Sequence, residues 1–506
     1  MAHPLPGILL HIPGTRDWPR APVAKRESGG LTQAGSCYRR RTSRANDSFR
    51  RCHVETASRK AKDGAFSRRK LLQGASAGIA ASLLASSGSS WAQNAQSERG
   101  SPGGQRLAAI TPESLPKAWS REEIQRRWQA VRQKMKEVEL DCLLVCQHHP
   151  GEMISERQDG DADIEYLTGI SLPYKWVVLP IEGKVAAIST NQVKGAREEK
   201  LSQERGIDVR IVDGPWSASI IDVMREANVA QGRIGVTDLV DASRQPEGEV
   251  SYTTYDRLLK VFPQAKFQPA SYLIDGVAAL HSPEEIAVLE KTTQVAELGL
   301  QAMFETARPG VAQRVVWLAM FNAMVNASGE RPFRVSVRAD GPGNSALNRP
   351  LEEVMRAGQV LSQECSGCVL GYGSQVNHSV VVGSPAPADW DAAAKDSLDA
   401  FGEMVALIAP GKMVKEICAP YDKRLVTRGD KPGALVIHSG GLGTLPRGGS
   451  AGAVGQIVLQ AGMVFDVKPA FRLKNGGTAQ FGDSVAVTEN GARRLGKREM
   501  KVVKLS

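Results

Sequence analysis

"RAGQVLSQE" at residues 356–364 and "QAGMVFDVK" at residues 460–468 decide the fold of this chain of 506 residues. Both stretches contain Ala-Gly-x-Val followed by a large apolar residue, and Gly358 and Gly462 lie 104 positions apart. Each stretch follows a helical pattern that stops at Pro-Gly, and the two prolines, Pro309 and Pro410, lie 101 positions apart. Two matches in the same order at similar offsets predict a domain of two related halves, each of roughly a hundred residues.

The repeat brings two charged residues to equivalent positions, because Glu364 ends the first stretch and Lys468 ends the second. If a pseudo-two-fold axis relates the halves, these side chains face each other at the centre of the domain. The segment 360–383, "VLSQECSGCVLGYGSQVNHSVVVG", is typical of two strands around a glycine turn. We expect Cys365 and Cys368 to be packing residues or a disulfide at the hairpin tip, because no helix start is present to stabilise a thiolate.

The segments around the repeat predict two domains. Ser120 and Glu123 form a capping box for a first helix, and strands are expected at "DCLLV", "IEYLTGI", "KWVVLPIEGKVAAIS" and "GRIGVTD". We therefore expect an α/β domain over residues 119–276. Ser282, Pro283 and Glu285 are typical of a helix start that opens the second domain, residues 277–506. The fold class is α/β (α+β).

The positive charge of the chain is confined to its first part. Residues 1–99 hold 17 of the 64 Lys and Arg and 6 of the 54 Asp and Glu, which gives them a net charge of +11. The whole chain has a net charge of +10, so the remaining residues carry −1. The rest of the chain is close to neutral, which argues against nucleic acid as a partner. Five of the seven cysteines lie beyond this part, and an odd number leaves at least one thiol free.

Residues 1–92 contain a segment that resembles a twin-arginine export signal. Arg68 and Arg69 precede a mildly apolar run, and a small-x-small site follows at Ser90 to Ala92. The run is too short to span a membrane. We expect export by the twin-arginine machinery, a mature protein that begins near Gln93 with a linker to residue 118, and a periplasmic or secreted location without a membrane span.

Six short motifs resemble landmarks of the pita-bread family, which includes aminopeptidase P, prolidase, methionine aminopeptidase and creatinase: "SPEEIAVLEK", "ARPGVAQ", "GPGNSAL", "AGQVLSQE", "AGMVFDVKP" and "GDSVAVTENG". "YLTGI" and the opening helix resemble the N-terminal domain of the creatinase branch. The resemblance covers residues 119–500 in order. It implies a creatinase-type N-terminal α/β domain, a pita-bread domain with pseudo-two-fold symmetry, and a possible homodimer.

Metal-dependent members of that family bind two divalent ions through two aspartates, a histidine and two glutamates. The resemblance places these positions on Glu364, Gln375, His438, Lys468 and Gly482, so only the histidine is unchanged. An ammonium group about 4 Å from a divalent ion is repelled by about 8 kcal/mol at an effective dielectric near 20. We therefore expect no metal cofactor.

The remaining polar residues suit acid–base chemistry. Creatinase works without metal through a histidine, and the imidazole pKa suits proton transfer near neutral pH. We expect His438, His378, Glu364 and Lys468 to be catalytic. Gln375 is expected to bind substrate, together with Asp483 if a one-residue slip brings it into the site. The alternative for His378 is an outward-facing strand residue.

Three functions fit these residues. The first is an exported, metal-independent hydrolase of a small amide, amidine or short peptide. The second is a metal-dependent Xaa-Pro aminopeptidase that uses Mn, Co or Zn. The third is a catalytically inactive protein that keeps the pocket to bind a ligand. Metal content separates the second from the others, and turnover separates the first from the third.

Overall fold

The computed structural model describes residues 110–146, 162–170, 174–190, 194–240, 248–341, 351–434, 436–442 and 450–505. The predicted export signal, the cleavage site and the first part of the linker lie outside the described residues. So do residues 342–347 of the motif "GPGNSAL". The domain boundaries at residues 93, 119 and 277 stay predictions.

The first sheet has six strands in the order β4-β3-β2-β1-β5-β6. Strands β1, β5 and β6 pair in parallel, β3 and β4 also pair in parallel, and β2 runs antiparallel to both of its neighbours. The strands are β1 (Cys142–Cys146), β2 (Tyr174–Pro180), β3 (Ala186–Thr190), β4 (Asp208–Val212), β5 (Arg233–Val236) and β6 (Lys266–Pro269). The helices are α2 (Arg121–Glu137), α3 (Ala162–Thr168), α4 (Arg197–Arg205), α5 (Trp216–Glu226), α6 (Tyr252–Val261) and α7 (Ser271–Ala278). This is the α/β architecture predicted for the first domain.

One element differs from its predicted type. "IEYLTGI" lies mostly in helix α3 and not in a strand, and every residue of α3 is buried. A short segment that is buried on all sides shows no periodicity, so the pattern of apolar residues does not separate a helix from a strand.

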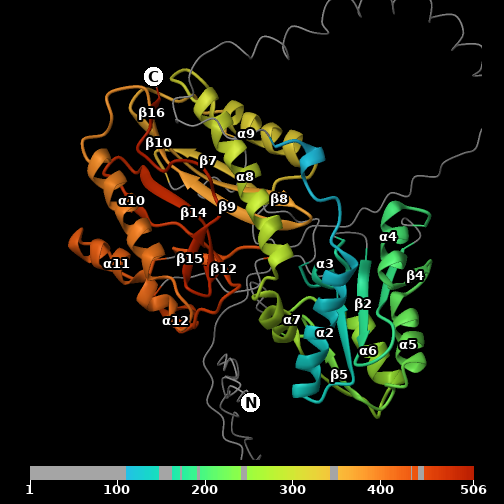
Figure 1. Cartoon of the computed structure of the whole chain (residues 1–506). Coiled ribbons are helices and arrows are strands. Elements are labelled where there is room, and N and C mark those ends of the chain that lie inside the picture. The colour runs from blue at the N-terminus through green and yellow to red at the C-terminus, as the bar shows by residue number, and fades with distance from the viewer. Residues whose placement is uncertain are drawn as a thin grey trace, which may run out of the picture. The chain divides into compact units, whose positions relative to one another are not determined.

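The second sheet has ten strands. Its central order is β11-β12-β14-β9-β8-β10-β16, with β13 and β15 on β14 and β7 on β8. The strands are β7 (Arg334–Ala339), β8 (Gln359–Val369), β9 (Tyr372–His378), β10 (Val380–Val382), β11 (Ile437–Ser439), β12 (Val464–Val467), β13 (Ala470–Arg472), β14 (Thr478–Thr488), β15 (Gly491–Arg494) and β16 (Lys504–Leu505). Helices α8 (Pro283–Thr306) and α9 (Gln313–Ser328) accompany β8 and β9, and α10 (Trp390–Leu407), α11 (Val414–Thr427) and the short α12 (Gly452–Gly455) accompany the second half (Figure 1).

The two halves of this second sheet repeat the same backbone contacts. Gly310 N donates to Met355 O at 2.9 Å in the first half, and Gly411 N donates to Leu459 O at 2.9 Å in the second. Gly358 and Gly462 both have a positive φ, 82° and 92°, which a glycine adopts without strain. The internal repeat predicted from the sequence is therefore confirmed as a repeat of structure.

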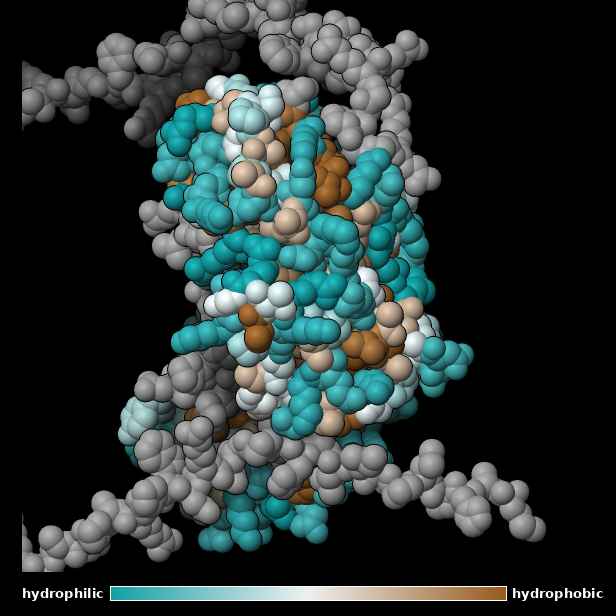
Figure 2. All heavy atoms as spheres, turned by 90° about the vertical axis from the view of Figure 1, so that its left-hand side faces the viewer, coloured by the Kyte–Doolittle hydropathy of each residue, from teal (hydrophilic) through white to brown (hydrophobic). Residues whose placement is uncertain are grey.

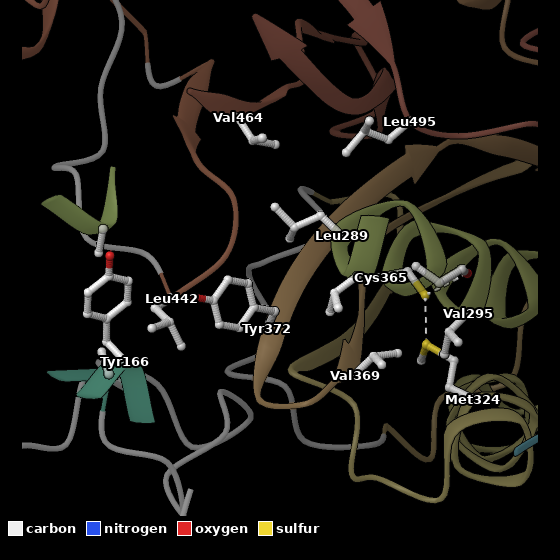
Figure 3. Packing of buried hydrophobic residues seen from close by; sticks show 14 of the residues in the cluster. Tyr166, Leu289, Val295, Met324, Cys365, Val369, Tyr372, Leu442, Val464 and Leu495 are labelled. Atoms are coloured by element: carbon white, nitrogen blue, oxygen red, sulfur yellow. Dashed lines mark hydrogen bonds between the residues drawn. The ribbon is translucent and has the colours of Figure 1, made fainter. Parts of the chain in front are cut away.

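Buried apolar side chains from α8, α9 and the second sheet pack in one cluster, part of which is drawn in Figure 3. Cys365 lies in this cluster, with Sγ 3.5 Å from Sδ of Met324 and 3.3 Å from the backbone oxygen of Ala296. Cys368 is three positions further along β8, contacts Glu330, and like Cys365 is not part of a disulfide. Cys365 and Cys368 are therefore packing residues and do not form the disulfide that was the alternative prediction.

The start of α8 carries a buried polar cluster. Ser282 caps the helix, and the Glu285 carboxylate accepts from Ser282 N at 2.7 Å, as the capping box predicts. The same carboxylate accepts from the Tyr372 hydroxyl at 2.6 Å and lies 3.3 Å from Nη2 of Arg127, which comes from α2. The helix start predicted from the sequence therefore also fixes one end of β9.

On the face shown in Figure 2, the described residues are predominantly hydrophilic, and the hydrophobic ones are scattered among them. Within the described ranges, no helix is long and apolar enough to cross a membrane.

Candidate active site

Five polar side chains gather on one face of the second sheet, around β8, β9, β11 and β12. All are between 3% and 9% exposed: Glu364, Gln375, His438, Asp466 and Lys468. Alternate residues of an extended chain point to the same face. Asp466 and Lys468 are two positions apart, so their side chains lie on one side of the sheet. The sheet thus brings together residues from four separate parts of the chain.

Glu364 lies between two cations. Lys468 Nζ donates to its Oε1 at 2.7 Å, and Arg334 Nε lies 3.0 Å from its Oε2. Burial alone raises the pKa of this carboxyl group, but the charges of Lys468 and Arg334 outweigh burial and hold the pKa well below its ordinary value. Glu364 is therefore ionised, and it is the anion that allows both cations to be buried.

Gln375 connects this ion cluster to His438. Its Oε1 lies 2.9 Å from Nε2 of His438 and accepts from Lys468 Nζ at 3.4 Å. The other ring nitrogen of His438, Nδ1, lies 3.2 Å from the backbone oxygen of Ser439 and 3.3 Å from Oδ2 of Asp466. Both ring nitrogens thus face oxygen atoms that accept hydrogen bonds.

Asp466 is held behind His438 by groups that donate to its Oδ1. These are the backbone N–H of Gln375, at 3.1 Å, and the hydroxyl of Ser484. Burial raises the pKa of Asp466 to about 7, although these donors and Lys468 oppose the shift. Asp466 can therefore hold a proton near neutral pH, and its Oδ2 lies 3.3 Å from Nδ1 of His438.

The contact of Glu364 with Lys468 follows from the sequence repeat, whereas Asp466 and Arg334 were not predicted. Asp466 could have been found from strand alternation, because it stands two positions before Lys468. Arg334 gave no such signal, since its strand, β7, pairs with β8 through a register that no motif specifies.

Gly482 faces the cluster on β14, and its lack of a side chain has a structural reason. A Cβ at this position would lie 2.6 Å from the backbone oxygen of Val467 and 2.7 Å from Cβ of Lys468. Such distances are too short for any side chain. The glycine at this ligand position therefore leaves the room that Lys468 occupies.

Asp483 lies on the opposite face of β14, so the one-residue slip that would bring it into the cluster does not occur. Its Oδ2 accepts from Arg498 Nη1 at 2.8 Å and lies 3.3 Å from Arg494 Nε. Burial raises its pKa to about 6, against the effect of these arginines. We correct the prediction that Asp483 binds substrate beside Gln375.

His378 is also separated from the cluster. It is three positions from Gln375 on β9, and an odd spacing places two strand residues on opposite faces. Its ring packs against Phe304 and Phe481, with centroids 5.1 and 4.9 Å away, and it is 1% exposed. Burial lowers its pKa to about 3. We correct the catalytic assignment of His378, and the alternative of an outward-facing residue is equally wrong, because the ring is buried.

The residues present do not fit a pair of divalent ions. Of the five ligand positions of the resemblance, one holds an ammonium group and one has no side chain, and the ammonium lies 2.7 Å from the single carboxylate among them. Divalent ions of this kind need several anionic oxygens. Within the described residues, no group of three or more His, Cys, Asp or Glu side chains is arranged to hold a metal.

Two family models match consecutive parts of the chain. The Creatinase/Prolidase N-terminal domain matches residues 127–277, and Metallopeptidase family M24 matches residues 287–489. An Xaa-Pro dipeptidase of Pyrococcus furiosus is 25% identical over 268 residues, which cover 51% of this chain and 74% of that protein. A creatinase of a Bacillus species (strain B-0618) is 23% identical over 421 residues, which cover 76% of this chain and 93% of that protein.

Solved structures show the same fold. A dipeptidase from Pyrococcus horikoshii superposes with a TM-score of 0.61 at 18% identity, over 75% of this chain and 100% of that chain. An Xaa-Pro dipeptidase from Bacillus anthracis superposes with a TM-score of 0.60 at 17% identity, over 76% of this chain and 100% of that chain.

Proposed function

Because the chain belongs to the pita-bread family of peptidases, prolidases and creatinases, we propose that it is a metal-independent hydrolase of a small carbon–nitrogen bond. The substrate is an amide, an amidine or a short peptide. The observation that carries the proposal is the ion pair of Lys468 with Glu364, 2.7 Å long, at two of the positions where metal-dependent members hold their ions. A buried ammonium group there supplies positive charge without a metal.

His438 is the proposed proton-transfer residue. A proton on each ring nitrogen gives a donor to Asp466 on one side and to Gln375 on the other, so the geometry suits an imidazolium. Such a group gives one proton to the leaving nitrogen as the carbon–nitrogen bond breaks. It recovers a proton from the water molecule whose oxygen forms the new bond to carbon, so atoms and charge balance.

The charged neighbours have supporting roles in this proposal. Asp466 holds His438 and stabilises its charged form. Lys468 and Arg334 balance Glu364, and the positive charge beside Gln375 stabilises negative charge that develops on the substrate in the transition state. Replacing His438 by Asn should reduce turnover by roughly a hundred-fold or more, the usual size of a proton-transfer contribution.

Metal content and turnover together test the proposal. The purified mature protein should contain well under one equivalent of Mn, Co, Zn or Fe, and should release amine or ammonia from at least one of a panel of amides, amidines and Xaa-Pro dipeptides. This activity should survive a chelator. About two equivalents of metal, removed together with the activity, would make the protein a metal-dependent aminopeptidase. Ligand binding without turnover would make it an inactive binding protein.

Export is the second part of the proposal, and it rests on the pair Arg68 and Arg69 and the site that ends at Ala92. Replacing both arginines by lysine should leave the precursor in the cytoplasm. The matched control replaces Arg50 and Arg51 by lysine, upstream of the apolar run, and should be exported normally. Export of both variants alike would contradict the twin-arginine route.

A further inference from the structure

Three side chains on the same sheet face as Glu364 have polar atoms that lack a hydrogen-bond partner among the described residues. They are Nε2 of Gln375, Oδ1 of Asn377 and Oγ of Ser336. All three residues are at most 3% exposed. Ser336 stands directly opposite Glu364 on β7, and Asn377 stands opposite Gly482 on β14. Buried polar atoms in proteins nearly always have a partner, so this group of atoms requires an explanation.

The orientations of the two side-chain amides are fixed by their other contacts. In Gln375 the oxygen Oε1 accepts from Lys468 Nζ, which can only donate, so the free atom is the NH2 group. In Asn377 the nitrogen Nδ2 donates to the backbone oxygen of Gln363 at 2.9 Å and lies 3.4 Å from Oε1 of Gln480. The free atom of Asn377 is therefore its carbonyl oxygen. The two side-chain amides thus offer one unused donor and one unused acceptor, and the hydroxyl of Ser336 can do either.

Gln375 and Asn377 are close enough on β9 for one small ligand to contact both. Gln375 and Asn377 are two positions apart on β9, about 7 Å along a strand, with side chains on one face. A ligand that fills both needs a carbonyl oxygen to accept from Gln375 and an N–H to donate to Asn377. An amide has both groups on adjacent atoms. An amidinium group only donates, so it would leave the NH2 group of Gln375 without a partner.

We propose that Gln375 and Asn377 bind the amide group of the substrate, so that the protein selects amides over amidines. Gln375 Nε2 donates to the substrate carbonyl, and Asn377 Oδ1 accepts from the substrate N–H. The inference rests on the proposed function, which leaves the choice between amide and amidine open. It assigns a specificity-determining role to Gln375 and adds Asn377 to the site.

The test measures binding without turnover, by ligand-observed NMR titration of the purified protein with three probes. N-methylacetamide offers a carbonyl and an N–H, N,N-dimethylacetamide offers only the carbonyl, and N-methylacetamidinium offers only donors. We expect N-methylacetamide to bind at least about ten-fold more tightly than either of the others. A tenfold difference corresponds to about 1.4 kcal/mol.

Two variants assign each half of the preference. Gln375→Glu keeps an oxygen toward Lys468 and replaces the NH2 group by an acceptor, so it should weaken both acetamides about ten-fold and favour the amidinium. Asn377→Leu should abolish the difference between N-methylacetamide and N,N-dimethylacetamide. Gln133→Glu, at an exposed glutamine of α2, is the matched control and should leave all three affinities unchanged.

The parent protein alone can overturn the inference. Amidinium binding as tight as that of N-methylacetamide would contradict it, and so would no binding of any probe, because the free atoms would then serve only buried water. Unchanged selectivity in a folded Gln375→Glu protein would contradict it too. Failure to hydrolyse any substrate would refute the proposed function and leave the binding preference standing. Hydrolysis of amidines by a protein that does not bind amides would support the proposed function and refute the binding preference.

Discussion

Lys468→Met removes the buried ammonium group and keeps most of the apolar stem, so it isolates the charge. Removing one member of a buried ion pair typically destabilises a protein by about 3–5 kcal/mol. In this structure Arg334 stays 3.0 Å from the other oxygen of Glu364, so the carboxylate keeps one cation. We therefore expect a smaller loss, about 2–4 kcal/mol. Glu364→Gln leaves Lys468 and Arg334 buried without their anion, so it should cost more than Lys468→Met.

Thermal denaturation followed by circular dichroism at pH 7 measures these losses. For a domain of this size, 1 kcal/mol shifts Tm by about 2–4 °C, so Lys468→Met should lower Tm by roughly 5–15 °C. The double variant with Glu364→Gln should lose less than the two single losses together, because each single variant already breaks the same pair. A Lys468→Met protein that melts like the parent would refute the reasoning. A Glu364→Gln protein that melts above Lys468→Met would refute the role of Arg334.

Three further predictions follow from single contacts. Gly482→Ala should lower the free energy of unfolding in urea by about 1–3 kcal/mol, because the new Cβ would lie 2.6 Å from a backbone oxygen. The control is Gly402→Ala, at a helical glycine whose Cβ would have no atom within 4 Å. It should leave the free energy of unfolding unchanged or raise it. Asp466 has its pKa raised to about 7, so between about pH 4 and 7 the folded state keeps a proton that the unfolded state releases, and stability falls as pH rises. The Tm of Asp466→Asn minus that of the parent should therefore be larger at pH 8 than at pH 5. An equal difference at both pH values would contradict the raised pKa of Asp466. Tyr372→Phe removes a 2.6 Å hydrogen bond to buried Glu285 and should lower the free energy of unfolding in urea by about 1–2 kcal/mol. No change would mean that the remaining partners of the carboxylate, Ser282 N among them, satisfy it without Tyr372.

The sequence determined the elements that depend on neighbouring residues. Ser282, Pro283 and Glu285 specify the start of α8 because a helix cap is a contact among residues three positions apart. The glycines at 358 and 462 specify two equivalent turns because only a residue without a side chain takes their positive φ without strain. The repeat of these local signals was enough to predict the fold and the approach of Glu364 to Lys468.

Only the tertiary structure decided which face each remaining polar residue occupies. His378 and Asp483 each lie next to the predicted site in sequence, yet a shift of one strand position turns a side chain to the other face of the sheet. Asp466 and Arg334 enter the cluster because β12 pairs with β14 and β7 pairs with β8 in registers that no local motif specifies. The composition of the site is therefore a property of strand pairing, since pairing alone decides which charges share one buried face.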